Sequence, residues 1–95
     1  MNILTLHPMD KEVSAVGLFK GESGNATAIQ LVKDGTLKEH VSKTPALLLC
    51  ISGKVNYEDE TGKLVELNVG DYINIEPMVT HWLNATQLSQ LILLK

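Results

Sequence analysis

The chain has 95 residues, of which 44% are hydrophobic and 20% are charged, which is the balance of an ordinary globular protein. A chain of this length holds one domain, residues 1–95. It contains no arginine, and its formal net charge is -3. Because arginine is the usual bidentate ligand of phosphate and guanine, this composition argues against nucleic acid as a partner.

The sequence has one cysteine and no long apolar segment. Cys50 can form no disulfide within the chain, and it lies in the apolar run 46–51, where a free thiol acts as a small hydrophobic side chain. No segment reaches the roughly 20 apolar residues of a membrane-spanning helix, and the first residues lack the basic region of a signal peptide. We therefore expect a cytoplasmic protein with no membrane partner.

The first part of the chain predicts short extended segments. A short edge strand is expected over residues 2–6, followed by a solvent-facing loop residue, His7. Residues 13–19 can belong to a short helix capped by Asp10 or to a strand. Gly17 weakens a helix, so the strand is favoured.

Turn residues recur along the rest of the chain at roughly the 8–12-residue spacing that is typical of β-sandwiches and barrels. No long helical pattern interrupts them. Further strands are expected over residues 26–32, 36–40, 47–51, 54–58, 63–67, 72–75, 81–84 and 88–94.

Two of these strands are unusually apolar. Residues 47–51 are apolar throughout, which predicts a strand buried on both faces. Residues 88–94 are the last strand, and an unprotected apolar edge of this kind invites aggregation. A second subunit that covers the edge would remove this hazard, so we expect a homodimer.

Two short motifs stand at the ends of the central block of strands. The first spans about residues 35–53 and places His40 shortly after its opening glycine. Period-two alternation puts Thr36 and Lys38 on the same face as this histidine. The second motif spans about residues 70–84 and has four β-forming residues within the order Gly70-Asp71, Pro77, His81 and Asn84.

The second motif resembles that of the cupin superfamily, in particular its small single-domain RmlC-like members. The resemblance covers about residues 30–94 and implies an all-β double-stranded β-helix, the cupin jelly roll, of two packed antiparallel sheets. The first motif is degraded. It keeps His40, but Ser42 stands at the position of the second histidine and Ala46 at that of the glutamate. In the second motif, Met78 stands where a second glycine is usual.

In cupins, the two histidines and the glutamate of the first motif bind one metal ion together with the histidine of the second. Only His40 and His81 carry over, so the resemblance implies at most one weakly held divalent metal ion as cofactor. Two neutral imidazoles can also orient a small polar or anionic ligand without metal. The expected ligand-binding residues are His40, Ser42, Ala46, Cys50, Tyr72 and His81.

Other polar and aromatic residues receive structural roles. Trp82 alternates away from His81 and is expected to pack against the second sheet or a partner subunit. Asp59 and Glu60 are expected at the solvated surface of a hairpin loop. Glu76, just before a proline, is the first candidate for a replacement carboxylate ligand.

Three functional hypotheses remain at this point. The favoured one is a small-molecule-binding cupin with weak or no metal binding. The first alternative is a metal-dependent enzyme of the dioxygenase or isomerase type. The second is a structural dimerisation module. A fold alone does not choose among them, because one fold hosts many functions.

Overall fold

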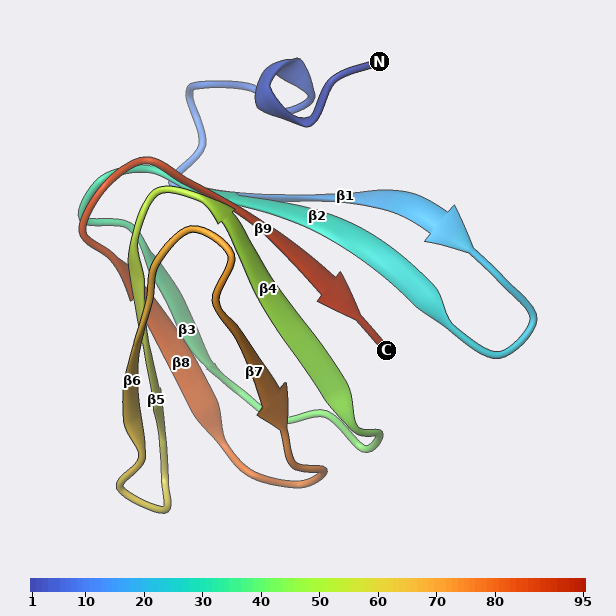
Figure 1. Cartoon of the computed structure of the whole chain (residues 1–95), viewed down its shortest axis with the longest axis vertical. Helices are drawn as coiled ribbons and strands as arrows, with labels where there is room; N and C mark the ends of the chain where they lie inside the picture. Colours follow the sequence, from blue (N-terminus) through green and yellow to red (C-terminus); the bar gives the residue numbers. More distant parts are fainter.

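Nine β-strands form two antiparallel sheets in the computed structural model, which describes residues 1–95 (Figure 1). The first sheet has five strands in the order β1-β2-β9-β4-β7, and the second has four in the order β3-β8-β5-β6. This arrangement confirms the prediction of an all-β fold of two packed antiparallel sheets. The strands are β1 (Val13–Lys20), β2 (Asn25–Leu31), β3 (Thr36–His40), β4 (Ala46–Ser52), β5 (Val55–Asp59), β6 (Leu64–Leu67), β7 (Tyr72–Ile75), β8 (His81–Ala85) and β9 (Ser89–Leu94).

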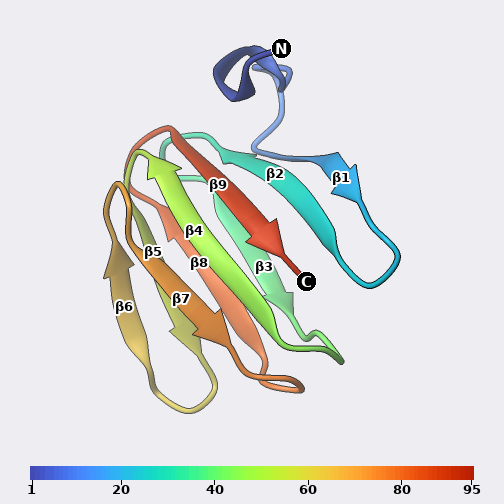
Figure 2. The same ribbon diagram turned by 45° about the vertical axis from the view of Figure 1, so that its right-hand side comes forward.

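Apolar side chains on the facing surfaces of the sheets form one core of 13 buried residues. The buried residues come from β2 and from β4 to β9, and along these strands the core side chains alternate, because successive side chains of a strand point to opposite faces. On β4 these are Ala46, Leu48 and Cys50, and on β5 they include Val55 and Tyr57. Figure 2 shows the two sheets one behind the other. The core residues pack between them. Packed side chains therefore occupy the interior, and the ends of the sandwich are the places left for a site.

The outer face of the five-stranded sheet is apolar but only partly covered. Leu47, Leu49 and Ile51 of β4 point away from the core and are half-buried. The prediction that this strand is buried on both faces is wrong for the outer one, because the second sheet packs against the inner face alone.

The last strand, β9, lies in the middle of the five-stranded sheet. Ile92 pairs with Ala28 of β2 on one side and with Leu49 of β4 on the other. The prediction of an exposed apolar edge at this strand is therefore wrong, and its apolar character reflects its central position. The two edges of the sheet are β1 and β7.

The N-terminal segment differs from its prediction. Ile3–Thr5 forms a 3-10 turn, and the Asn2 side-chain oxygen accepts a hydrogen bond from the Leu4 amide at 2.8 Å. His7 is buried, not solvent-facing, with 6% of its surface exposed. The prediction of a strand in the next segment is confirmed by β1. No helix in the structure is both long enough and apolar enough to cross a membrane.

Gly53 lies in the connection from β4 to β5, where the chain passes from one sheet to the other and is closely packed. Its φ of +87° is unfavourable for other residues, and a Cβ added there would overlap with Ser89 Oγ and the Leu88 carbonyl. Gly62 has a similar φ of +89° but open space around it. We predict that Gly62→Ala lowers the free energy of unfolding by about 1 kcal/mol, and that Gly53→Ala lowers it by roughly 1–3 kcal/mol more. Urea denaturation of both variants measures the difference, and equal losses would contradict the close contact.

Candidate functional site

Two histidines from neighbouring strands meet at one end of the sandwich. β3 and β8 pair His40 directly with His81. Their ring centroids lie 4.0 Å apart, with an interplanar angle of 60°. His81 is buried, whereas His40 is partly exposed. The pair therefore has one side against the core and one side toward the surface.

A β-bulge in β3 turns His40 inward. The register between β3 and β8 shifts between Leu37 and His40, and Leu37 packs against the core. Two residues separate these inward side chains, so strict alternation is broken. The prediction that Thr36 and Lys38 share the face of His40 is therefore wrong; the exposed Lys38 lies in the bulged part of the strand.

Main-chain carbonyls fix the orientation of both rings. His81 Nδ1 lies 2.9 Å from the Val79 carbonyl, and His40 Nδ1 lies 3.0 Å from the Lys38 carbonyl. A carbonyl only accepts hydrogen bonds, so each neutral ring carries its proton on Nδ1. Each Nε2 is then left with a lone pair that can accept a hydrogen bond or bind a metal ion.

A buried tyrosine and aspartate support this pair, and the sequence analysis did not assign them to the site. The Tyr57 ring stacks on the His81 ring at a centroid distance of 5.8 Å. The Tyr57 hydroxyl donates to Asp59 Oδ2 at 2.8 Å, while Asp59 Oδ1 accepts from the Thr61 amide at 2.9 Å. Asp59 is only 8% exposed, so the prediction of a solvated carboxylate is wrong for this residue. Period-two alternation along 55–59 was the sequence signal that could have placed both side chains inward.

Burial and hydrogen bonds set the protonation states of these groups. Burial lowers the pKa of His81, and the nearby His40 lowers it further, although the Val79 carbonyl opposes the change. Burial, followed by the neighbouring Asp59, raises the pKa of Tyr57. The Thr61 hydroxyl holds the pKa of Asp59 below its ordinary value. At neutral pH the site therefore contains a neutral His81, a protonated phenol and an ionised carboxylate.

The other predicted site residues lie in different places. Ser42 is buried near the histidines, but its hydroxyl donates to the Thr44 carbonyl at 2.9 Å within its own loop. Ala46 lies at the same end, where β4 begins. Cys50 lies four residues further along β4, roughly 13 Å away at the usual rise per residue. Tyr72 is 61% exposed and points away from the interior. The structure thus brings His40, His81 and Ala46 to one end and leaves Cys50 and Tyr72 apart from them.

The side chains at this end of the molecule are too few to form the metal site of cupins. No group of three or more His, Cys, Asp or Glu side chains lies close enough together to hold a metal ion. The histidine pair offers two Nε2 atoms, while both Asp59 oxygens already accept hydrogen bonds and Glu76 is exposed. Because catalytic zinc sites usually have three protein ligands, these residues fit at most a weakly held ion.

Trp82 lies on the outer face of the four-stranded sheet. It does alternate away from His81, but its half-buried indole Nε1 donates to Glu58 Oε2 at 3.3 Å on the surface. The prediction that it packs against the second sheet is therefore wrong. Together with Thr36 and Lys38 it borders a shallow hollow on this side of the molecule.

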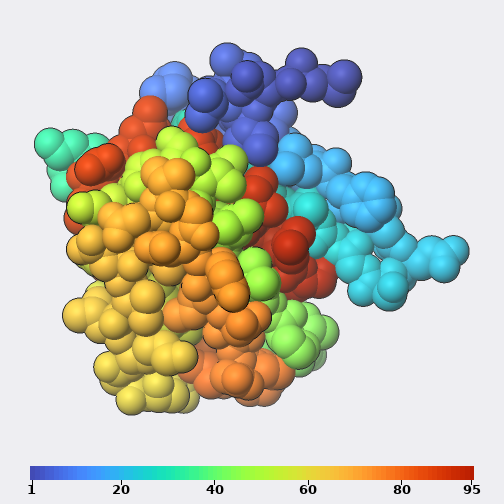
Figure 3. Space-filling view, viewed as in Figure 1, coloured from blue at the N-terminus to red at the C-terminus, as the bar shows by residue number.

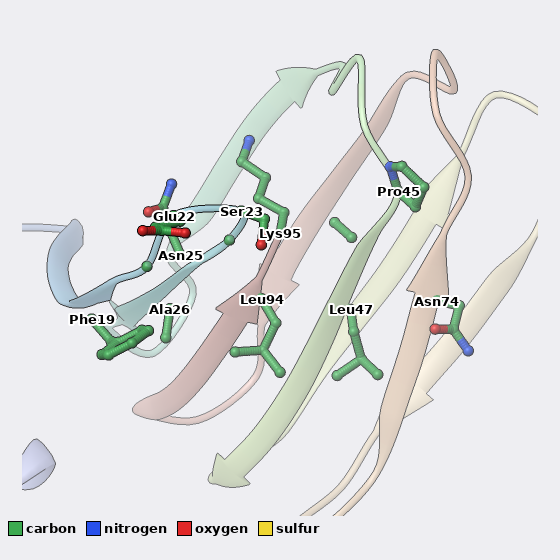
Figure 4. A pocket seen from close by; sticks show the side chains of 13 residues that line it. Phe19, Glu22, Ser23, Asn25, Ala26, Pro45, Leu47, Asn74, Leu94 and Lys95 are labelled. Carbon is green, nitrogen blue, oxygen red and sulfur yellow. The ribbon is translucent and has the colours of Figure 1, made fainter.

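A hollow of about 580 Å³ lies apart from the histidine pair. It lies between the β1–β2 hairpin and the start of β4 (Figure 4). Leu94 and Leu47 form its floor and are paired neighbours on β9 and β4, while Phe19 stands on the hairpin side. The floor residues face away from the core, so this hollow belongs to the outer face of the five-stranded sheet.

Comparison with solved structures identifies the fold. No protein-family model matches the sequence, and neither does any curated protein. The protein is similar to a cupin superfamily protein from Desulfitobacterium hafniense, with 10% identity, a TM-score of 0.87, and coverage of 98% of this chain and 84% of that one. An RmlC-like cupin from Shewanella frigidimarina gives 17% identity, a TM-score of 0.81, and coverage of 92% and 78%. A conserved protein of unknown function from Streptococcus pyogenes gives 20% identity, a TM-score of 0.79, and coverage of 92% and 75%. The chain therefore has the cupin fold, as its motifs predicted.

The buried His81 makes the stability of the protein sensitive to acid. Its pKa in the folded chain is lowered from 6.5, so the unfolded chain binds the proton more tightly. Its contribution to stability is therefore fully present above about pH 6.5 and is lost as the pH falls below that value. We predict that NMR titration of the His81 ring gives a pKa below 6.5. On acidification, the free energy of unfolding of the His81→Gln variant should decrease less than that of the wild type. A ring that titrates at or above the ordinary value would contradict this prediction.

Proposed function

We propose that this chain, which has the cupin fold, binds a small molecule through His40 and His81. The observation that carries the proposal is the meeting of two imidazoles whose Nδ1 atoms are both engaged by main-chain carbonyls. Two Nε2 lone pairs are then available from adjacent strands. Binding sites of this kind combine apolar walls with a few oriented polar groups. Here the Tyr57 ring stacks on His81 and the apolar Ala46 lies at the same end, both of them buried.

The chemistry of the pair defines the ligand. Neutral Nε2 atoms accept hydrogen bonds, so the ligand presents hydroxyl, amine or acid hydrogens to His40 and His81. Because packed side chains fill the interior beyond Tyr57, the ligand is small or only its end enters. A partly apolar molecule held by one or two hydrogen bonds meets both conditions.

A divalent metal ion is a weaker occupant of the same position. Two imidazoles without a carboxylate hold such an ion loosely, and protonation of the rings competes with it. Metal-dependent catalysis of the dioxygenase or isomerase type requires a third protein ligand, and the neighbouring side chains supply none. The binding hypothesis therefore has better support than the enzyme hypothesis.

We also propose that the protein forms a homodimer through the outer face of its five-stranded sheet. Strands β4, β7 and β9 contain no charged residue. Half-buried or exposed apolar side chains, among them Leu49, Ile92 and Leu94, cover this face. Interface cores are depleted of charge, and a two-fold dimer brings the same patch of both subunits together. A second copy of the chain therefore suits this face better than a charged partner does.

The binding proposal predicts a specific loss in one variant. His40 is partly exposed, so His40→Ala should fold normally yet weaken the binding of nickel, used as a probe of the pair, by more than about tenfold. Wild-type binding should itself be weak and should decline below about pH 6, where imidazoles protonate. Isothermal titration calorimetry measures both effects, and circular dichroism checks the fold.

Glu76→Gln is the matched control for this experiment, because it removes an exposed carboxylate near the same end of the molecule. We expect no change in nickel affinity from this variant. Tight, chelator-resistant nickel that is lost in Glu76→Gln would reveal a third ligand and favour the enzyme hypothesis. A thermal-shift screen of small polar molecules extends the test. If no compound stabilises the wild type more than His40→Ala, the binding proposal is refuted.

The dimer proposal predicts a change in mass. The wild type should scatter light as twice the 10.4 kDa chain. Tyr72→Lys places a charge on the outer face at a side chain that is 61% exposed, and should raise the dimer dissociation constant by more than about tenfold. Leu64→Lys, at a position 66% exposed on the four-stranded sheet, should leave it unchanged. A monomeric wild type at micromolar concentration would contradict the proposal.

A further inference from the structure

The first twelve residues lie at one end of the five-stranded sheet and contact its outer face beside β1 and β2. We use the name N-terminal strap for residues 1–12. In Figure 3 its dark-blue atoms lie against the upper end of the molecule, beside β1 and β9. It contains one short turn and no strand. Before Glu12, whose main-chain carbonyl and carboxylate accept hydrogen bonds from the Val32 and Thr36 amides, it is attached by a few side-chain contacts with β1 and β2.

Those contacts form a buried polar row. Ser14 pairs with Gln30 across β1 and β2, and Gln30 pairs with Gln90 across β2 and β9. The Gln90 side-chain amide donates to Gln30 Oε1 at 2.7 Å, and Gln30 Nε2 donates to the Pro8 carbonyl of the strap at 3.4 Å. Neighbouring residues on β2 and β9 belong to the core, so this row faces outward and is covered from the outside.

His7 anchors the strap to this row. Its Nδ1 lies 2.7 Å from Ser14 Oγ, and the ring is buried with 6% of its surface exposed. His7 Nε2 is buried without any hydrogen-bond partner, and the same is true of Gln90 Oε1. In either neutral tautomer the ring already leaves one group unpaired. Protonation would add a charge and turn both nitrogens into donors, and Nε2–H has no acceptor.

No counter-charge faces this ring. Strands β2 and β9 contain no charged residue, and the only one on β1 is Lys20 at its far end. On the strap itself, Asp10 and Lys11 are exposed, and Glu12 Oε2 accepts a hydrogen bond from the Thr36 amide instead. Burial alone therefore acts on His7 and lowers its pKa.

We propose that His7 is an acid-sensitive latch, and that its protonation releases the N-terminal strap while the two-sheet core stays folded. Release exposes Ser14, Gln30 and Gln90 next to the apolar outer face of the sheet. It thereby changes the surface that this face offers to a partner. Segments held by few contacts open at lower free energy than a core does, so the strap can open locally while the core stays folded.

The sign of the pH effect follows from the burial of the ring. The released strap has an ordinary histidine pKa of about 6.5, and the latched strap has a lower one. Latching is therefore fully favourable above about pH 6.5 and weakens as the pH falls below it. Between the two pKa values, the ratio of released to latched strap rises about tenfold for each unit by which the pH falls.

The experiment follows backbone order by NMR in the whole protein. Heteronuclear NOE values for the backbone amides of residues 2–10, other than Pro8, are compared at about pH 7.5 and pH 5.0, with the amides of Leu48 and Leu83 as reporters of the core. We expect the values of the strap to fall at the lower pH while those of the core stay high. A strap that stays ordered at pH 5.0, or a strap and core that lose order together, would overturn the proposal.

Two variants assign the effect to one residue. His7→Asn does not titrate but can still donate to Ser14 Oγ, so its strap should have the same order at both pH values. His40→Ala should keep the wild-type pH dependence, because this ring lies at the other sheet. If His7→Asn is disordered throughout, the wild-type titration decides: a His7 ring pKa at or above about 6.5 overturns the latch.

Discussion

Apolar packing between the inner faces of the two sheets is the constraint on which the rest of the structure depends. Side chains alternate along each strand, so one face of β2 and of β4 to β9 is committed to the core. Tyr57, Leu48 and Leu83 are almost completely buried between the sheets. This packing leaves no room for a deep ligand cavity in the interior. Chemistry is therefore confined to the end of the sandwich, where His40 and His81 pair across β3 and β8.

The bulge in β3 shows how a small irregularity builds a site on such a scaffold. With strict alternation, Leu37 and His40 would face opposite sides of the sheet. One additional residue lets Leu37 pack in the core and still turns His40 toward His81. The main-chain carbonyl two residues before each histidine then sets its tautomer. Backbone geometry, rather than a set of side-chain ligands, thus prepares the two lone pairs.

The sequence predicted what depends on local patterns. Strand positions followed from turn residues and alternation, and the two motifs led to the histidine pair and to the cupin fold. The features that the sequence did not predict depend on contacts between distant segments. The central place of β9 depends on pairing with β2 and β4, and the burial of His7 depends on how the first residues fold over β1. Asp59 was missed because a hairpin loop suggests solvent, although its strand continues inward up to that residue.

Burial lowers the pKa of His81 and of His7 for the same reason, but the two effects act on different parts of the molecule. His81 belongs to a central strand of its sheet and stacks on Tyr57, so its charging opposes the folding of the whole sandwich. Asp59 also lies nearby and partly offsets the loss. His7 belongs to a segment without strand pairing and has no carboxylate beside it. Protonation of a buried ring destabilises the smallest part of the structure that must open to expose the ring. For His7 this part is the N-terminal strap.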